Sequence, residues 1–248
     1  MDKMNRVFRC GNESFFLFGP RGTGKTTWLK DNLTNAYVVD LLKNDIRLRL
    51  MANPERLRDM VAANDDCNQI VIDEIQKVPA LLDVVHSLME EFPSKRFVLT
   101  GSSARKLKRA GVDLLGGRAL ELKMHPFMAC ELGESFDLDD ALMTGLVPVI
   151  GKYANKECQL AAYLQLYIRE EVEQEGLVRN LDAFARFLEA MAFSHAGVLS
   201  ASEISRECMV KRATVDGYIQ ILRDLLIGGT LPVFSKRAKR RMVTHAKF

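Results

Sequence analysis

The stretch from Phe15 to Thr27, FFLFGPRGTGKTT, decides the fold of this chain. Its four leading apolar residues predict a short buried strand, and the residues after them fit the phosphate-loop pattern G-x-x-x-x-G-K-[ST] from Gly19 to Thr26. The glycines of such a loop let backbone N–H groups turn inward toward phosphate oxygens. A helix is expected to start at the end of the stretch, and its N-terminus adds a partial positive charge of about half an electron. A strand before the loop and a helix after it together predict a nucleotide-binding loop.

Each residue of this loop is a candidate for contact with a nucleotide. Lys25 is expected to reach the β- and γ-phosphates, which also makes it a candidate catalytic residue, and the Thr26 hydroxyl is expected to bind Mg²⁺. The candidate nucleotide-binding residues are Gly19, Pro20, Arg21, Gly22, Thr23, Gly24, Lys25, Thr26 and Thr27.

A second element of chemical interest is the apolar strand predicted at Gln69–Glu74, which ends in two adjacent carboxylates. In a nucleotide hydrolase of this type the first acid, Asp73, would hold the Mg²⁺ shell, and the second, Glu74, would orient and deprotonate the attacking water. Both stand at the carboxyl end of their strand, the side on which a parallel sheet exposes ligands. The alternative is a pair of solvated acids that merely end a strand, and the phosphate loop upstream favours the catalytic interpretation.

Two further side chains are candidates for contact with the phosphates. Ser102 follows a strand predicted at Arg96–Thr100, where a hydroxyl can sense the γ-phosphate or its water; the alternative is that Ser102 or Ser103 caps a helix. Arg118 precedes a last predicted strand and could reach the nucleotide of a neighbouring subunit, a contribution of about 10³–10⁵ in phosphoryl transfer. The alternative for this arginine is an ordinary surface position after a glycine turn.

The order of predicted elements gives the fold class. Strands alternate with helices, which implies an α/β fold with a parallel sheet flanked by helices on both faces, as in a P-loop NTPase. The predicted helices of this region cover 44–50, 53–61 and 78–92, and a second strand covers 36–41. We expect three regions: a nucleotide-binding core at 1–130, a helical linker or lid at 131–180 that includes a helix at 159–176, and a helix-turn-helix region at 181–248.

The last region has the layout of a winged helix-turn-helix. A capping box at Ser200–Glu203 starts a short helix, and after a turn a second helix is predicted at Lys211–Leu226, where it could enter a DNA major groove. Strands at 230–234 and 242–248 would form a two-stranded wing around a basic turn suited to phosphate contacts. The basic residues of this turn are Lys236, Arg237, Lys239, Arg240 and Arg241. The alternative is a helical protein-binding module with a solvated basic loop, so the sequence leaves DNA and protein partners open.

Composition narrows the class of protein. The chain has 248 residues, is 48% hydrophobic and 27% charged, and carries a net charge of +3, values that suit a folded protein with a sizeable core. Its five cysteines are scattered and its four histidines dispersed, which argues against a zinc site or a disulfide framework and favours a reducing, cytoplasmic location. No apolar run is long enough to span a bilayer, so no membrane association is expected.

Several segments together resemble a prokaryotic family of predicted AAA+-superfamily ATPases, of the AAA_14 and DUF4143 type. The hallmark of that family is the Asp-Glu-Ile-Gln-Lys Walker B motif, here Asp73–Lys77, and its members carry a winged-helix region. The segments that carry the resemblance are Phe18–Thr27, Val71–Pro79, Leu99–Arg105, Leu115–Ala119, His125–Phe127 and Gly145–Pro148.

The resemblance implies ATP and Mg²⁺ as cofactors, with Lys25 and Thr26 at the phosphates and the metal, and with Asp73 and Glu74 as the metal and water residues. Family members usually continue into a nuclease-like domain where this sequence ends at Phe248, which leaves the final strand without an expected partner. This departure from the family removes any basis for predicting nuclease activity.

The main hypothesis is an ATPase that couples Mg²⁺-dependent ATP hydrolysis to the winged-helix region. Glu74 is the candidate base, and Arg118 acts in trans in a homo-oligomer. The alternative is a regulatory switch whose ATP occupancy controls DNA or protein binding with little turnover. Glu74 argues against that alternative, because a pure switch needs no acid that activates water.

Overall fold

The computed structural model describes residues 6–102, 107, 115–165, 172, 178, 180–232 and 246–248. Contacts divide the chain into two compact units, residues 1–163 and 164–248. The strands are β1 (Phe15–Phe18), β2 (Ala36–Asp40), β3 (Gln69–Asp73), β4 (Arg96–Gly101) and β5 (Leu120–Lys123). The α-helices of the first unit are α1 (Lys25–Asn32), α2 (Asn44–Ala52), α3 (Arg56–Ala62), α4 (Leu81–Glu91), α6 (Ala129–Leu132), α7 (Leu138–Thr144) and α8 (Lys156–Tyr163). Its short 3₁₀ turns are η1 (Ile75–Lys77), η2 (Leu115–Gly117), η3 (Gly133–Ser135) and η4 (Ile150–Lys152).

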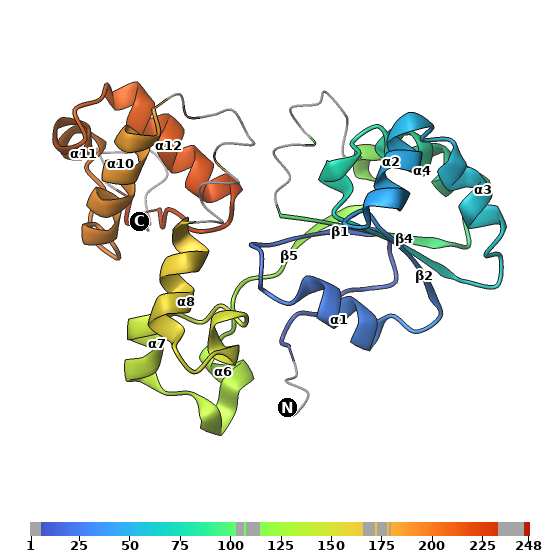
Figure 1. Ribbon diagram of the computed structural model, residues 1–248, viewed down its shortest axis with the longest axis horizontal. Coiled ribbons are helices and arrows are strands. Elements are labelled where there is room, and N and C mark those ends of the chain that lie inside the picture. Colours follow the sequence, from blue (N-terminus) through green and yellow to red (C-terminus); the bar gives the residue numbers. More distant parts are fainter. Residues whose placement is uncertain are drawn as a thin grey trace, which may run out of the picture. The chain divides into compact units, whose positions relative to one another are not determined.

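The described residues of the first unit form a five-stranded parallel sheet in the order β2-β3-β4-β1-β5. The chain crosses from β1 to the far edge at β2 and then returns one strand at a time to β4. Because parallel crossovers are right-handed, these opposite directions place the connecting helices on opposite faces. Figure 1 shows this arrangement, with α1 on one face and α2, α3 and α4 on the other. The predicted α/β fold class is confirmed.

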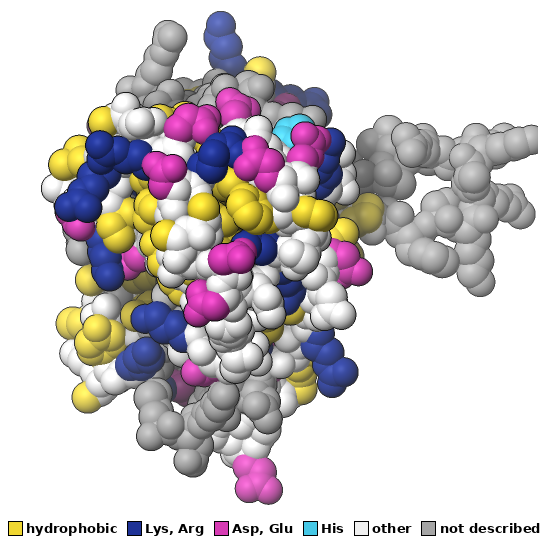
Figure 2. All heavy atoms as spheres, turned by 90° about the vertical axis from the view of Figure 1, so that its right-hand side faces the viewer, with side chains coloured by type: hydrophobic (Ala, Val, Ile, Leu, Met, Phe, Trp, Pro, Cys, Tyr) yellow, Lys and Arg dark blue, Asp and Glu magenta, His cyan; other side chains and the backbone are white. Residues whose placement is uncertain are grey.

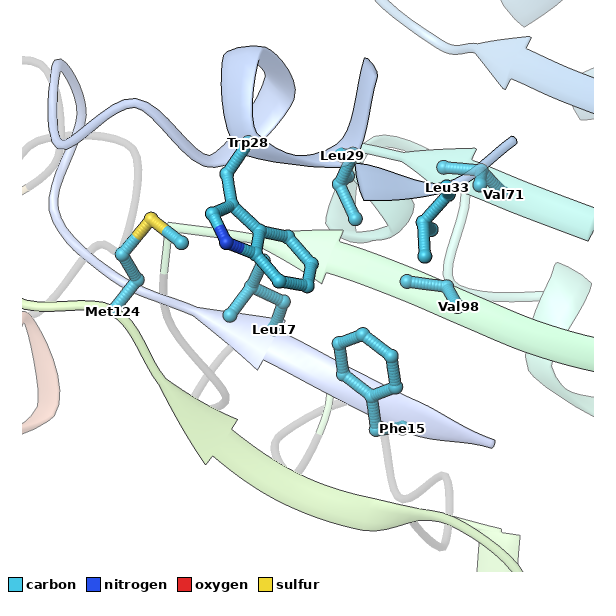
Figure 3. Packing of buried hydrophobic residues seen from close by; sticks show 8 residues of the cluster. All are labelled: Phe15, Leu17, Trp28, Leu29, Leu33, Val71, Val98 and Met124. Atoms are coloured by element: carbon cyan, nitrogen blue, oxygen red, sulfur yellow. The ribbon is translucent and has the colours of Figure 1, made fainter. Parts of the chain in front are cut away.

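The sheet is buried on both faces, which is why β1 is apolar without alternation. All four residues of β1 are buried, and successive side chains point to opposite faces. On the α1 face, Trp28 and its neighbours on that helix pack over the strands (Figure 3). The eight buried residues of this cluster are Phe15, Leu17, Trp28, Leu29, Leu33, Val71, Val98 and Met124. This packing fixes the helix that follows the phosphate loop against the strand that precedes it.

Most elements expected in this unit are present with small shifts of their ends. The helix predicted at 53–61 begins at Arg56, because the Asn53 side chain accepts a hydrogen bond from the Glu55 N–H (3.1 Å) and the chain makes a turn first. The helix predicted at 78–92 begins at Leu81, after the separate turn η1. For the helix predicted at 159–176 the described part includes α8, which begins earlier, and residues 166–171 and 173–176 lie outside the described residues.

Beyond β5 the chain continues into short helices that belong to the first unit through residue 163. Glycine positions and turns interrupt these helices, in keeping with the irregular sequence pattern of this part. The three-way division at residues 130 and 180 stays a prediction.

The second unit contains α10 (Leu181–Phe193), α11 (Ala201–Glu207) and α12 (Arg212–Asp224). Phe184, Phe187 and Tyr218 join α10 to α12, with ring centroids 5.0–5.7 Å apart. One half of the predicted capping box is confirmed, because the Ser200 hydroxyl accepts the Glu203 N–H. The second helix is shorter than predicted: it ends at Asp224, and Leu226 adopts a left-handed conformation (φ 57°) that stops it.

The C-terminal residues of the second unit pair on both sides. Lys247 bridges Val198 and Leu231 in antiparallel fashion, and the N–H and C=O groups of Leu231 and Lys247 exchange hydrogen bonds of 2.7 and 3.1 Å. The expectation of a final strand without a partner was therefore wrong, because residues near 198, before the helix pair, supply its second edge. The five basic residues predicted in the wing turn, at 236–241, lie outside the described residues, as does most of the predicted wing.

Candidate nucleotide site

The sheet order brings the polar ends of three strands together. β4 lies between β1 and β3, with Phe18 in register with Gly101 and Ile72 in register with Leu99. Because the strands are parallel, the phosphate loop after β1, the acids that end β3 and the polar turn after β4 share one edge. The predicted meeting of these three segments is therefore a direct consequence of the topology.

Lys25 is the buried cation of the phosphate loop. Only 6% of its surface is exposed, and its Nζ donates hydrogen bonds to the carbonyl oxygens of Gly19 (2.6 Å) and Pro20 (3.1 Å). The buried Thr23 hydroxyl donates to the same Pro20 carbonyl at 2.8 Å and closes the turn. The ammonium group is thus held within the curve of the loop.

The N-terminus of α1 is built to receive an anion. Its N-cap, Gly24, supplies no side-chain cap, and no acidic residue stands in the first turn. The first N–H groups of a helix have no acceptor within the helix, so here they remain available to phosphate oxygens. Because no side chain caps this helix, a phosphate group would not have to displace one in order to bind its N–H groups.

The segment after β5 supports the outer side of the loop. Gly22 has φ +77°, and a Cβ on it would lie 2.5 Å from Val149, whose N–H also donates to the Gly22 carbonyl at 3.3 Å. The Tyr163 hydroxyl donates to the Arg21 carbonyl at 3.0 Å. A side chain at position 22 would be excluded by both the backbone conformation and this contact, so the loop is shaped by residues more than a hundred positions away.

Asp73 links the end of β3 to the first turn of α1 and to β4. Its side chain is 3% exposed; one carboxylate oxygen accepts from the Thr26 hydroxyl at 2.9 Å, and the other accepts from the Thr100 hydroxyl. Hydroxyl and carboxylate oxygens are the hard ligands that Mg²⁺ prefers, so Thr26 and Asp73 fit a magnesium site.

Glu74 has a strained backbone. It lies directly after β3 with φ +64°, uncommon for a residue other than glycine, and its N–H donates to the Thr100 hydroxyl at 3.0 Å. Its carboxylate accepts from the Gln76 amide at 2.5 Å. Sparsely populated backbone conformations persist where the surroundings hold them, and they cluster at functional sites.

The other two candidate residues have different positions. Ser102 is fully buried at the end of β4, 3.4 Å from the Gln76 amide nitrogen; its alternative role as a cap involves residues outside the described ones. Arg118 is exposed and forms an ion pair of 2.8 Å with Glu90 of α4. It precedes β5, at the amino edge of the sheet, about 10 Å or more along the strands from the phosphate loop. The structure does not bring Arg118 to the phosphate loop of its own chain.

The N-terminal lead-in is tied to the segment after β5. Arg6 donates to the His125 carbonyl, lies 3.3 Å from the Glu131 carboxylate and stacks 4.7 Å above the Phe127 ring. The Val7 N–H donates to the same carboxylate at 2.7 Å. Burial lowers the pKa of the Arg6 guanidinium, and the Glu131 charge opposes this effect.

Sequence reasoning missed three contributors to the site. Thr100 was placed at the end of the strand and in its polar turn but was not itself a candidate residue, although its hydroxyl joins both acids. Gln76 was noted only as part of a motif. Val149 supports the loop from a segment that looked irregular. A polar residue at the end of a buried strand is the signal that could have identified Thr100.

The described helices include none that is long and apolar enough to cross a membrane.

Two family models match the two halves of the chain. Residues 11–133 match the family model of an AAA domain, and residues 135–248 match that of a domain of unknown function (DUF8612). The first match indicates a nucleotide-binding, ATPase-like domain and agrees with the AAA+ resemblance. The DUF4143-like part of that resemblance stays an expectation.

One relative is an uncharacterized protein of Haemophilus influenzae, 21% identical over 210 residues. The match covers 77% of this chain and 52% of the relative, so the chain spans about half the length of that protein. Among solved structures, a replication initiator DnaA bound to AMPPCP and single-stranded DNA has a TM-score of 0.40 at 14% identity, covering 86% of this chain and 82% of that one. AMPPCP-bound DnaA from Aquifex aeolicus has a TM-score of 0.37 at 15% identity, with coverages of 88% and 83%.

Proposed function

We propose that this protein is a Mg²⁺-dependent ATPase whose turnover acts on its second unit. The observation that carries the proposal is the bonded chain from Thr26 to Asp73, Thr100 and Glu74, directly beside the buried Lys25. Two hydroxyls, the Asp73 carboxylate and the Lys25 ammonium group lie where three strands end, and Glu74 adds a second carboxylate directly after β3. A site for nucleotide binding alone does not require the second carboxylate.

Each side chain has a distinct role in this proposal. The backbone of residues 19–27 and the α1 N-terminus hold the phosphates, and Lys25 moves from the loop carbonyls to the β- and γ-phosphate oxygens. Thr26 and Asp73 would hold Mg²⁺, which neutralises charge on the phosphate oxygens. Ser102 contacts the γ-phosphate or its water from the end of β4.

Glu74 is the base. It orients a water in line with the bond from the γ-phosphorus to the bridging oxygen and takes its proton as the new phosphorus–oxygen bond forms. The bridging oxygen leaves with ADP, and inorganic phosphate is the second product. The left-handed backbone of Glu74 directs its side chain from the strand end while Thr100 holds its N–H.

The test is phosphate release from ATP with and without Mg²⁺, in the wild type and in Glu74→Gln. We expect Mg²⁺-dependent turnover that falls by about 10²–10⁴-fold in the variant, because general-base catalysis contributes about that much. ATP affinity should stay within a few-fold. Glu189→Gln, on an exposed face of α10, is the matched control and should turn over as the wild type does. Tight ATP binding without turnover under any condition would favour the regulatory switch instead.

The second unit is proposed to be a winged helix that receives the output. Its helix pair α11–α12 exposes Arg212, Gln220 and Arg223 on α12, the polar face that would approach a groove. Acidic residues share this face, because Arg212 pairs with Asp216 at 4.0 Å and Gln220 donates to Asp224 at 2.7 Å. On the face of the chain in Figure 2, basic and acidic side chains are likewise interspersed among hydrophobic ones. Stimulation of ATP turnover by duplex DNA, lost in Arg223→Ala, would support DNA as the partner; no stimulation would favour a protein partner.

A further inference from the structure

We propose that Gln76 is a positioning residue, which couples the base Glu74 to the end of β4 and so to the phosphate loop. The inference rests on the proposed ATPase function and concerns a residue to which the motif alone assigns no role. It is drawn from the contacts of the Gln76 side chain, which lies in η1 and is only 8% exposed.

The Gln76 amide joins two candidate site residues. Its Nε2 donates to Glu74 Oε2 at 2.5 Å and lies 3.4 Å from the Ser102 hydroxyl. One oxygen of the Glu74 carboxylate is therefore held, and the other, Oε1, is the one that would receive a proton from water. A base with one oxygen fixed and its backbone restrained through Thr100 has little freedom to leave the reactive geometry.

The orientation of this amide follows from its neighbours. Reversing it would place two acceptor oxygens 2.5 Å apart, so the NH₂ group must face Glu74. Gln76 Oε1 is then buried, and no hydrogen-bond partner for it exists among the described residues. A buried acceptor without a partner costs stability, whereas an apolar side chain of the same shape would avoid this cost. The contact of Nε2 with the carboxylate explains why a glutamine stands here despite the cost of its buried oxygen.

The end of β4 is fitted around Gln76. A Cβ on Gly101 would lie 2.7 Å from Gln76 Oε1, closer than real side chains permit. The Gly101 carbonyl in turn accepts the N–H of Gly19, the first residue of the phosphate loop, at 3.3 Å. The loop is therefore connected through Gly101 and Gln76 to Glu74. A shift of the loop on nucleotide binding would change the position of the Glu74 carboxylate.

The decisive variant is Gln76→Met, which keeps the length and volume of the side chain but removes both the donor and the buried acceptor. We expect kcat to fall about 10- to 100-fold, since a misplacement of about 1 Å costs up to that much. The ATP dissociation constant, measured by calorimetry and compared with that of Glu74→Gln, should change less than about threefold, because the Gln76 amide bonds Glu74 and Ser102 rather than a described residue of the phosphate loop.

Two controls separate positioning from a structural role. Gln69→Met is the same substitution at the first residue of β3, the strand that leads to η1, where the amide donates to the Thr34 carbonyl; kcat should be unchanged. Unfolding of Gln76→Met, followed by the fluorescence of Trp28, should show stability equal to or above that of the wild type. Lower kcat without lower stability is the signature of a functional glutamine.

The double variant Gln76→Met with Glu74→Gln tests the connection itself. If Gln76 acts through Glu74, the residual turnover of Glu74→Gln should not fall further when Gln76 is replaced. A further loss of the same size would overturn the inference, and so would an unchanged or raised kcat in Gln76→Met while the wild type turns over normally. Wild-type protein without Mg²⁺-dependent turnover would overturn the ATPase proposal and this inference together.

Discussion

The two units of this chain bury different kinds of side chain. In the first unit six buried polar or charged residues gather at one edge of the sheet, namely Thr23, Lys25, Asp73, Gln76, Thr100 and Ser102. In the described part of the second unit the buried side chains are apolar, apart from the mildly polar groups of Cys208 and Tyr218. The charged residues of α12 lie at the surface instead.

This difference suits a first unit that carries out the chemistry and a second unit that contacts a partner. A buried polar group costs stability unless it is hydrogen-bonded, and a buried charge costs more, so a cluster of six is retained only where the site needs it. In the second unit the buried residues serve packing, and the polar residues of α12 lie at the surface, where a partner could contact them. The predictions below test this contrast, from the largest expected effect to the smallest.

The largest expected effect concerns Arg118. If a neighbouring copy supplies this arginine to the nucleotide site, a single chain holds an incomplete site. Arg118 stands at the opposite edge of the sheet, so only the site of a neighbouring copy could use it. Turnover per chain should rise with protein concentration, and Arg118→Ala should remove a rise of up to about 10³-fold. Arg56→Ala, an exposed arginine of α3, serves as the control. A concentration dependence that survives in Arg118→Ala would contradict this role.

The second prediction concerns the apolar core of the second unit. Phe187→Ala removes a fully buried ring that contacts Phe184 and Tyr218, so it should destabilise that unit by about 3–5 kcal/mol. Phe193→Ala, on the same helix but 93% exposed, should change stability by less than about 0.5 kcal/mol. Hydrogen exchange of the two units measures both effects. Equal loss of protection in β1–β4 would show that the units do not fold separately.

The third prediction tests the buried cation of the first unit. Lys25→Met keeps the length of the side chain but removes its charged hydrogen bonds, and should weaken ATP binding about 10- to 100-fold. Lys30→Met, an exposed lysine on the same helix, should leave the affinity unchanged. Calorimetric titration with ATP and Mg²⁺ measures both variants. Equal affinities in the two variants would contradict the phosphate role of Lys25.

The smallest effect is a pH dependence confined to the second unit. Burial is the main cause that raises the pKa of Cys208 above its ordinary 9.0 and that of Tyr218 above 10.0. As the pH rises the unfolded chain therefore ionises first, so stability is complete below about pH 9 and declines above it. Urea unfolding followed by circular dichroism should show this decline, and Cys208→Ala should reduce it. An identical decline in that variant would exclude the thiol as a cause.

The sequence predicted the site where its residues are contiguous. The phosphate loop and the Asp73–Glu74 pair follow buried strands, and their spacing along the chain is enough to predict both segments and their meeting at one sheet edge. The end of α12 was predicted two residues too late because Leu226 continues the apolar pattern while its backbone has already left the helix. Local periodicity reports which face is buried, and it does not report where the backbone turns.

Contacts between distant segments could not be predicted in this way. Gly22 against Val149, and Arg6 against Glu131, depend on how the segment after β5 returns to the loop and the lead-in. The contact of Thr100 with Asp73 depends on β4 being inserted between β1 and β3, and several strand orders satisfy the same alternation of elements.

By itself the sequence determined that this chain folds as an α/β nucleotide-binding protein, because a glycine-rich loop between a buried strand and a helix is a local structure with its own steric requirements. Only the tertiary structure decided which side chains restrain Glu74 and which edge of the sheet holds Arg118. The physical reason is that hydrogen bonds between strands depend on strand order and register. Both are settled by the packing of the whole unit rather than by any one segment.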